Sequence, residues 1–348
     1  MRVLVTGAGG LIGSDAVKSF LKGALVWGID NDMRSKFFGS QGTVEPVIKQ
    51  LRSLEGYTHF RSDITDVEQM QTIFKKVRPD VIIHCAAQPS HDKAASIPIL
   101  DFNVNAFGTI NLLECMRKFC RDDAVFLHMS TNKVYGDAPN QILMTESDLR
   151  YDFKPLQYQN GISESFSIDN CLHSLFGASK LSADITAQEY GKYFNLNIGI
   201  FRGGCLTGPQ HAGVELHGFL SYIVKCAVLK RPYTVFGYKG KQVRDQIHSC
   251  DVISAFNKFI ESPCQGEVYN IGGGRKNSAS ILEVIQILRE QYNLKLDYKI
   301  LDENRVGDHI CYYTDLLKLK QHFPGWSITK DLDEIIEEMV YSHREGKT

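Results

Sequence analysis

Short apolar runs alternate with longer stretches of mixed apolar and polar residues through roughly the first 200 residues of the chain. The short runs are rich in β-branched side chains and predict strands, whereas the longer stretches carry apolar residues at helical spacing. This alternation is typical of a parallel sheet covered by helices, so we expect a doubly wound α/β (Rossmann) fold. The predicted strands are Arg2–Thr6, Ala24–Ile29, Thr58–Arg61, Val81–Cys85, Ala124–Met129 and Asn197–Arg202, and the main helices are Leu11–Lys22, Val67–Lys75, Leu100–Phe119 and Leu175–Tyr193.

The pattern changes in the middle of the chain. Gly136–His173 is rich in Asp, Asn, Pro, Gln and Ser, and predicts a long loop over an active site. Further on the alternation is irregular, with helices expected near Leu216–Leu229, Ser280–Gln291 and Asp331–Tyr341. We therefore expect an NAD-binding Rossmann domain of residues 1–202 with about 232–262, and a smaller, discontinuous α/β substrate-binding lobe of residues 203–231 and 263–348.

Composition and charge narrow the class of protein. Of 348 residues, 43% are hydrophobic and 23% are charged, which is typical of a soluble globular protein. The net charge of −1 gives no reason to expect a nucleic acid or an anionic membrane as partner. Nine scattered cysteines without a CxxC pair indicate reduced thiols, and no metal site is predicted. Because no apolar run reaches ~18 residues and no signal peptide is visible, we expect a cytoplasmic protein.

A glycine-rich turn follows the first predicted strand. Gly7, Gly10 and Gly13 would let the backbone approach a pyrophosphate at the N-terminus of the next helix, although such a turn also fits an ordinary tight connection. The second predicted strand ends at Asp30, about 20 residues further on, where a carboxylate can accept hydrogen bonds from the ribose hydroxyls of NAD. Together these features predict an NAD site. Asp30 would repel the 2′-phosphate of NADP, whereas the positive charge of Arg34 could bind it, so NADP stays an alternative cofactor.

The GxxGxxG spacing of these glycines resembles that of the extended short-chain dehydrogenase/reductase superfamily, in particular its nucleotide-sugar epimerases and dehydratases. The resemblance covers nearly the whole chain. Among the subfamilies, Ser130–Asp137 and Gly240–Asp245 are most similar to the CDP-paratose 2-epimerases. This implies a nucleoside-diphosphate sugar as substrate, with a CDP-sugar favoured, and bound NAD that oxidises a carbinol and later returns the same hydride. The other matching strings are Asp63–Ile64, His84–Gln88, Asn103–Val104, Gly108–Glu114, Gly237–His248 and Arg305–Asp308.

The resemblance also implies a set of site residues and an assembly. It implies a homodimer or higher homo-oligomer that forms through the helices beginning near Leu100 and Leu175. Thr131 matches the hydroxyl that hydrogen-bonds the reacting oxygen. The implied cofactor residues are Gly7, Gly10, Leu11, Ile12, Gly13, Asp30, Asn31, Asp63, Ile64, Ala86, Ala87, Gln88, Asn103 and Lys180. The implied substrate residues are His91, Tyr135, Cys205, Glu215, Leu216, Arg244 and Arg305. Of these, Arg244 and Arg305 would bind the diphosphate. Cys205 stands where many relatives carry an asparagine.

The tyrosine that serves as acid/base throughout the superfamily is absent. There it lies four residues before a lysine, so that both side chains share one helix face, and cationic neighbours lower its pKa from ~10. In this chain Phe176 occupies the position four residues before Lys180. Because a phenyl ring has no proton to exchange, either another group transfers the proton or this chain does not catalyse the reaction.

Three interpretations stay open at this point. In the first, the chain is an enzyme and Lys180 is the base, its pKa lowered by partial burial and by the neighbouring cationic ring of the cofactor. In the second, the chain binds NAD and a sugar nucleotide without catalysis; the retention of Thr131 and Lys180 with Asp30, Arg244 and Arg305 argues against it. In the third, Phe176 is an engineered replacement. Other candidates for the acid/base are His91, Glu164, His173, Tyr135 and Cys205.

The reaction also has alternatives within the superfamily. A 4-epimerase or a 4,6-dehydratase acting on another nucleotide-sugar would use the same cofactor site. Dehydratases carry an acidic pair after the catalytic threonine in order to eliminate water, whereas this chain has Asn132 and Lys133 there. The sequence therefore favours epimerisation.

Overall fold

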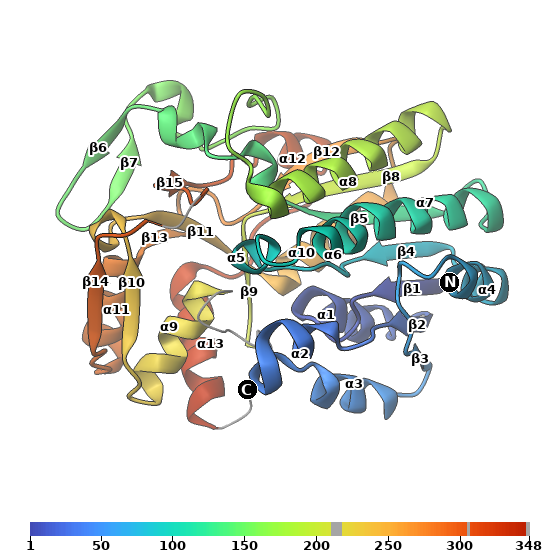
Figure 1. Cartoon of the computed structure of the whole chain (residues 1–348), viewed down its shortest axis with the longest axis horizontal. Helices are drawn as coiled ribbons and strands as arrows, with labels where there is room; N and C mark the ends of the chain where they lie inside the picture. The colour runs from blue at the N-terminus through green and yellow to red at the C-terminus, as the bar shows by residue number, and fades with distance from the viewer. Residues whose placement is uncertain (210–217, 305–306, 346–348) are drawn as a thin grey trace. The chain divides into compact units, whose positions relative to one another are not determined.

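The computed structural model describes residues 1–209, 218–304 and 307–345 (Figure 1). The chain divides into two compact units. The first comprises Met1–Val134, Leu175–Arg202 and Val252–Tyr269, and the second comprises the described residues of Tyr135–Ser174, Gly203–Asp251 and Asn270–Thr348. This division differs from the domain boundaries expected from the sequence, because residues 135–174 belong to the second unit and the late segment of the first unit is 252–269.

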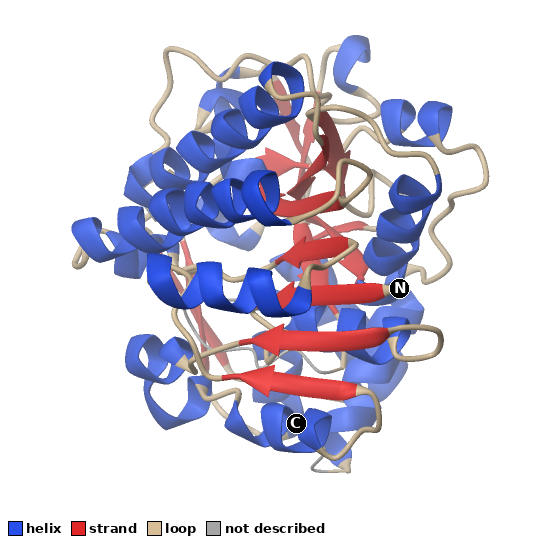
Figure 2. Cartoon of the chain, turned by 90° about the vertical axis from the view of Figure 1, so that its right-hand side faces the viewer, coloured by secondary structure: helices blue, strands red, loops and turns tan. Residues whose placement is uncertain are grey.

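A seven-stranded sheet with the order β12-β8-β5-β4-β1-β2-β3 forms the centre of the first unit. The pairings from β3 through β2, β1 and β4 to β5 are all parallel, and Figure 2 shows helices on both faces of the sheet. The predicted doubly wound fold is therefore confirmed. The strands are β1 (Arg2–Thr6), β2 (Leu25–Ile29), β3 (Tyr57–Phe60), β4 (Val81–His84), β5 (Val125–Thr131), β8 (Asn197–Gly203) and β12 (Glu267–Ile271).

The helices of this unit bury apolar residues at helical spacing against the sheet. In α4, Met70, Ile73, Phe74 and Val77 are buried, and Asp66 caps the helix by accepting a hydrogen bond from the Gln69 amide. The same pattern places one hydrophobic core between helices and strands. The helices are α1 (Leu11–Phe20), α2 (Met33–Phe38), α3 (Glu45–Arg52), α4 (Val67–Val77), α5 (His91–Ala94), α6 (Pro98–Phe102), α7 (Gly108–Phe119), α8 (Ser174–Tyr193) and α10 (Ser249–Glu261).

The helix expected over Leu100–Phe119 is interrupted. A π-helical turn, Asn103–Phe107, joins α6 to α7. At its end, the Thr109 hydroxyl donates to the Asn105 carbonyl at 2.6 Å. A π turn changes the direction of the side chains that follow and is frequent at functional sites. Hydrophobic spacing did not reveal it, because one wider turn shifts the apolar pattern by only one residue.

The second unit contains small sheets and four helices among its described residues. β11 pairs with β13, β15 and β9, β10 pairs with β14, and β6 with β7 forms an antiparallel hairpin inside the segment expected to be a loop. Its core lies between α9, α11 and α13. Its elements are β6 (Met144–Glu146), β7 (Tyr151–Phe153), β9 (Cys205–Thr207), β10 (Tyr233–Phe236), β11 (Val243–His248), β13 (Ser278–Ser280), β14 (Tyr298–Leu301), β15 (Cys311–Tyr312), α9 (Phe219–Val228), α11 (Ile281–Tyr292), α12 (Leu317–His322) and α13 (Leu332–Arg344).

In the part of the chain that the structure describes, none of the helices combines the length and the apolar character needed to span a membrane. The same residues bring together no group of three or more His, Cys, Asp or Glu side chains that could hold a metal ion.

Candidate functional site

The predicted cofactor residues gather at one edge of the first unit's sheet. Parallel strands end at the same edge, and a ligand of such a sheet binds where neighbouring strands lead to opposite faces, here between β1 and β4. The glycine-rich turn follows β1, Asp30 and Asn31 follow β2, and Asp63 and Ile64 follow β3. Ala86, Ala87 and Gln88 follow β4, Thr131 ends β5, Asn103 lies in the π turn and Lys180 lies in α8.

The turn between β1 and α1 leaves no room for side chains. A Cβ on Gly13 would lie 2.0 Å from the Gly7 carbonyl oxygen, and one on Gly7 would lie 2.7 Å from the Ala86 amide nitrogen. Gly7 also has a φ of +69°, which favours glycine. A Cβ on Gly10, by contrast, would meet only the Gly7 oxygen at 3.4 Å, so its Cα borders open space at the start of α1. The turn therefore fits close approach of a pyrophosphate to the backbone.

Asp30 is held for hydrogen bonding at the end of β2. Its carboxylate accepts from the backbone amides of Gly9 and Asp32, each at 2.9 Å. Burial raises the pKa of this carboxyl, although both amide bonds act in the opposite direction. Each oxygen keeps capacity for a ribose hydroxyl. The Arg34 guanidinium lies over the Phe38 ring, 4.9 Å from its centre. Burial lowers the pKa of Arg34, and the nearby negative charges of Asp30 and Asp32 act in the opposite direction.

The loop after β3 is linked to the loop after β2. The Asn31 side-chain amide donates to Asp63 at 3.1 Å, and the other Asp63 oxygen accepts from the Thr65 amide and hydroxyl. Ile64 is buried, and its carbonyl accepts from Asn111 of α7 at 2.8 Å. These bonds place the pair expected at the adenine beside the Asp30 loop.

A buried imidazole shapes the turn after β4. His84 Nδ1 lies 2.7 Å from the Thr6 hydroxyl and Nε2 lies 2.9 Å from the Thr109 hydroxyl. The Thr6 hydroxyl also accepts from the Ala86 amide at 3.3 Å. Burial lowers the pKa of His84 to about 3, with help from the positive charge of Lys180, so the ring is neutral. The bonds tie β1, β4 and α7 together at the cofactor edge.

The next residues along this loop reveal a buried polar network that sequence analysis missed. Gln88 donates to Asp101 at 2.7 Å, and Asp101 accepts from the hydroxyl of Ser179 and from the amide of Asn105. The Ser179 hydroxyl contacts the Phe176 carbonyl oxygen at 3.0 Å. All polar atoms of the Gln88 side chain bond within the protein, so Gln88 supports the site from behind. The spacing of Asp101 and Asn105, one helical turn apart, was the available signal.

Lys180 lies buried one turn after Phe176 on α8. Its Nζ donates to the Met129 carbonyl oxygen at 2.8 Å. Burial lowers the pKa of Lys180 to about 8, opposed by the negative charges of Asp184 and Asp101. At neutral pH most of the Lys180 side chains are therefore still protonated, but the neutral amine, which is the form that accepts a proton, is far more populated than for an ordinary lysine.

Thr131 and its neighbours end β5 beside this lysine. The Thr131 hydroxyl accepts from the Lys133 amide at 3.2 Å. Ser130 donates to Asp184 of α8 at 2.6 Å, and Arg202 of β8 contacts the same carboxylate through two nitrogens at 2.8 and 3.0 Å. The helix that carries Phe176 and Lys180 is thus fastened to both strands.

His91 is the other candidate in this unit. It begins α5, in the loop held by the bond from the Ser90 amide to Gln88, and its Nδ1 lies 3.6 Å from Asp92. Nε2 is buried without a hydrogen-bond partner among the described residues. The ring can therefore still donate to or accept from a ligand.

The second unit holds Tyr135 and Glu164, which meet at one residue. The fully buried Tyr135 hydroxyl donates to the Asn270 side chain at 2.7 Å, and the backbone N–H of Asn270 donates to Glu164 at 2.6 Å. Burial raises the pKa of Glu164. Tyr135 is thus bonded as a structural residue, while one Glu164 oxygen holds the segment against β12. The third candidate of this segment, His173, lies 3.7 Å from the Cys171 sulfur.

Arg244 lies on β11 with its guanidinium bonded to protein acceptors. It donates to Asp308 at 2.6 Å and to the Val243 carbonyl at 2.7 Å, and the Asp308 charge raises the pKa of Arg244 against the effect of burial. Cys205 begins β9, which pairs with β11 opposite Gln246. The predicted substrate residues Glu215, Leu216 and Arg305 lie outside the described residues.

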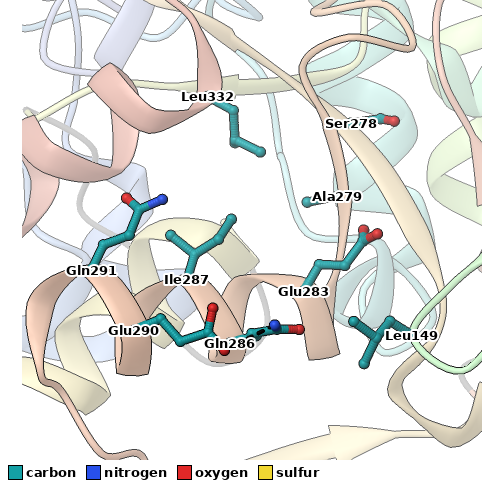
Figure 3. Close-up of a pocket in the computed structure, with 9 residues that line it drawn as sticks. All are labelled: Leu149, Ser278, Ala279, Glu283, Gln286, Ile287, Glu290, Gln291 and Leu332. Carbon is teal, nitrogen blue, oxygen red and sulfur yellow. Dashed lines mark hydrogen bonds between the residues drawn. The ribbon is translucent and has the colours of Figure 1, made fainter.

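A surface pocket of the second unit lies beside α11 (Figure 3). Glu283, Gln286 and Glu290 project from this helix, with Leu332 of α13 and Leu149 at its rim. No predicted site residue that the structure describes lines it. Glu283 is already used by the capping box of α11 and by Arg150 at 3.4 Å, so we assign the pocket no role.

Comparison with known proteins agrees with this arrangement. The family described as "NAD dependent epimerase/dehydratase family" matches residues 3–272. The chain is 31% identical over 326 residues to the CDP-paratose 2-epimerase of Salmonella typhi, with 92% of each covered. It is 28% identical over 363 residues to the dTDP-glucose 4,6-dehydratase of Escherichia coli, covering 100% of this chain and 94% of that protein.

A solved structure shares the whole fold. It is a tyrosine-to-phenylalanine mutant of the UDP-glucuronic acid 4-epimerase of Bacillus cereus, in complex with UDP-4-deoxy-4-fluoro-glucuronic acid and NAD. Its TM-score is 0.80 at 26% identity, and 99% of each chain is covered. The predicted superfamily, its class of enzyme and its cofactor are therefore confirmed: the chain belongs to the NAD-dependent epimerase/dehydratase family.

Proposed function

We propose that this chain is an NAD-dependent epimerase that acts on a nucleoside-diphosphate sugar as the CDP-paratose 2-epimerases do, with a CDP-sugar as the favoured substrate. The observation that carries the proposal is Lys180, a buried amine with a pKa lowered to about 8 in the same unit as the cofactor residues. Holding NAD alone would not require the lowered pKa of this lysine, because a fully charged ammonium can donate the same hydrogen bonds to the cofactor.

The cofactor would be held by the residues at the carboxyl edge of the sheet. The Gly7–Gly13 turn would bind the pyrophosphate, Asp30 the ribose hydroxyls and the Asp63 loop the adenine. When bound, NAD supplies a reversible acceptor for the hydride of a carbinol carbon. Arg244 would exchange its contact with Asp308 for one with the diphosphate of the substrate.

Lys180 would replace the missing phenol. Its neutral amine would take the proton of the carbinol oxygen as the carbon is oxidised, and would return that proton when the carbon is reduced on its other face. The bond to the Met129 carbonyl holds Nζ while its lone pair stays free for this proton. Thr131 would hold the reacting oxygen through its hydroxyl. His91 and Glu164 stay secondary candidates for the same proton.

Epimerisation is favoured over dehydration. Elimination of water needs an acid and a base after the catalytic threonine, whereas Asn132 and Lys133 stand there. A catalytically silent binding protein is the alternative of another class. We further propose a cytoplasmic location, which suits nine cysteines that are all free thiols in the structure.

We also propose a homodimer through α6, α7 and α8. α7 and α8 lie side by side (Figure 1), joined by the bond from the Tyr190 hydroxyl to Glu114 at 2.8 Å. Apolar side chains stay exposed on α6 and α8, including Ile99 at 77% and Phe102 at 50% on α6 and Leu175 at 50% on α8. A second copy of the same surface would cover them.

The activity is tested by incubating the purified protein with a panel of CDP-, UDP-, GDP- and dTDP-sugars in deuterated water. We expect an epimer of one sugar, without loss of water and without carbon-bound deuterium, observed by NMR. A dehydrated, deuterated product would reveal a dehydratase. Binding without turnover, followed by activity in Phe176→Tyr, would show that the chain as it stands is silent.

Asp30→Asn should weaken binding of NAD. Losing a charged acceptor of hydrogen bonds costs about 1.5–3 kcal/mol, so Kd should rise about 10- to 100-fold by calorimetric titration of the apoprotein. Glu68→Gln, on the exposed face of α4, removes the same charge away from the site and is the control. Unchanged affinity in Asp30→Asn would contradict the assignment of the ribose site.

The turnover rate should rise with pH through about 8, because Lys180 must lose its proton to act as a base and its pKa is lowered to about 8. Lys180→Met should abolish turnover while the purified protein keeps bound NAD. Lys192→Met, exposed near the end of the same helix, is the matched control. A rate that falls with pH over this range, or activity in Lys180→Met, would move the role to another residue.

Sedimentation velocity should give the mass of a dimer. Ile99→Glu should shift the protein toward monomer, because it places charge in the proposed interface. Leu156→Glu replaces an equally exposed apolar residue of the second unit, 80% exposed against 77% for Ile99, and should stay dimeric. A monomeric parent protein would refute the proposed interface.

A further inference from the structure

A cysteine, a histidine and a glutamate lie in succession in the second unit. The Cys250 sulfur lies 2.9 Å from Nδ1 of His248. Nε2 of His248 lies 3.1 Å from a carboxylate oxygen of Glu338, an ion-pair distance at which the two atoms are not aligned as a hydrogen bond. Cys250 lies in the first turn of α10, whose residues up to Asp251 belong to the second unit. His248 ends β11, and Glu338 comes from α13, about ninety residues away in sequence. None of the three is among the residues assigned to cofactor or substrate.

The hydrogen bonds set the proton on the imidazole. The Cys250 amide nitrogen donates to Nδ1 at 3.1 Å, so Nδ1 is an acceptor and the ring proton lies on Nε2, which faces Glu338. The side chain of His248 is only 10% exposed, which holds its orientation. Glu338 is itself held by Lys330 at 2.9 Å. A thiol in contact with an imidazole whose other nitrogen faces a carboxylate has the order of groups found in a base-activated nucleophile, and a small rotation of the Glu338 side chain would align its bond to Nε2.

Cys250 is also accessible. All nine cysteines lie in the described residues, and Cys250 is the one classed as exposed. Its immediate charged neighbours are Asp251, Glu338 and Lys330, with Glu334 beyond Lys330. Desolvation, together with Asp251 and Glu338, raises the pKa of the thiol, while the contact with the Thr329 hydroxyl and the charge of Lys330 oppose this. The resting group is therefore the thiol, and a nucleophile forms only if a base removes its proton during attack.

We propose that Cys250 is a thiol activated by His248 and Glu338, and that it is a site of reversible modification by small organic disulfides. The Cys250 proton moves to Nδ1 of His248 while the sulfur attacks one sulfur of the disulfide, and the S–S bond breaks. The departing thiolate then takes the proton back from the imidazole. Cys250 is oxidised to a mixed disulfide, and the departing sulfur is reduced to a thiol, so no further oxidant is needed.

The experiment uses 5,5′-dithiobis(2-nitrobenzoate) on the NAD-bound protein at pH 7, with the released thiolate followed by absorbance. We expect one fast phase, mapped to Cys250 by mass spectrometry of the peptides and lost in Cys250→Ser. Its rate constant should exceed that of N-acetylcysteine at the same pH. A merely exposed thiol with a raised pKa would react more slowly than this free thiol.

Glu338→Gln tests the activation itself. The change should slow the fast phase at least about 10-fold, because general-base assistance contributes factors of ~10² or more. Glu337→Gln removes the same charge from an exposed neighbour on α13 and should leave the rate unchanged. The thermal transition of each variant checks its folding. A fast phase at another cysteine, or a Glu338→Gln protein that reacts at the parent rate, would overturn the proposal.

Discussion

The position of α8 depends on one buried carboxylate. Asp184 is fully buried, and it accepts from Ser130 of β5, from two nitrogens of Arg202 of β8, and from Gln188 one turn further along α8. A buried charge without these partners costs several kcal/mol, so helix and strands must meet in this register. Because Lys180 lies one turn before Asp184, the same pairing sets where its amine meets Met129.

The buried cation of the second unit, Arg244, is likewise paired with protein groups of opposite polarity. The guanidinium of Arg244 is 11% exposed and bonds to Asp308 and to two backbone carbonyls. A diphosphate would offer the same planar fork two acidic oxygens in place of one carboxylate. Asp308 therefore keeps Arg244 paired before substrate arrives, and it also makes the exchange less favourable than binding to an unpaired arginine. Affinity for a nucleotide would be set by the difference between the two pairings.

The sequence predicted those features of the molecule that depend on the spacing of neighbouring residues. The parallel sheet, the Gly7 turn and Asp30 follow from period and from residue type, because each requirement involves neighbouring residues. Asp101 and Arg202 were missed. The spacing of Asp101 and Asn105 was a local signal, but Ser179 lies 78 residues from Asp101 and Asp184 lies 18 residues from Arg202, and no spacing encodes these two contacts. The π turn was not predicted for a related reason, because only tertiary packing distinguishes it from a continuous helix.

The same reasoning explains how Phe176 and Lys180 could suit one another. A phenol needs its pKa lowered from ~10, which a neighbouring ammonium achieves by favouring the phenolate. That phenolate would in turn favour the charged lysine and raise its pKa. A lysine that is itself the base needs the opposite conditions, namely apolar neighbours and little negative charge beside it. Asp184 and Asp101 already act to raise the pKa of Lys180, and the buried phenyl ring of Phe176, one turn away, adds no further anion. The change from phenol to phenyl therefore preserves the low pKa on which the proposed proton transfer by Lys180 would depend.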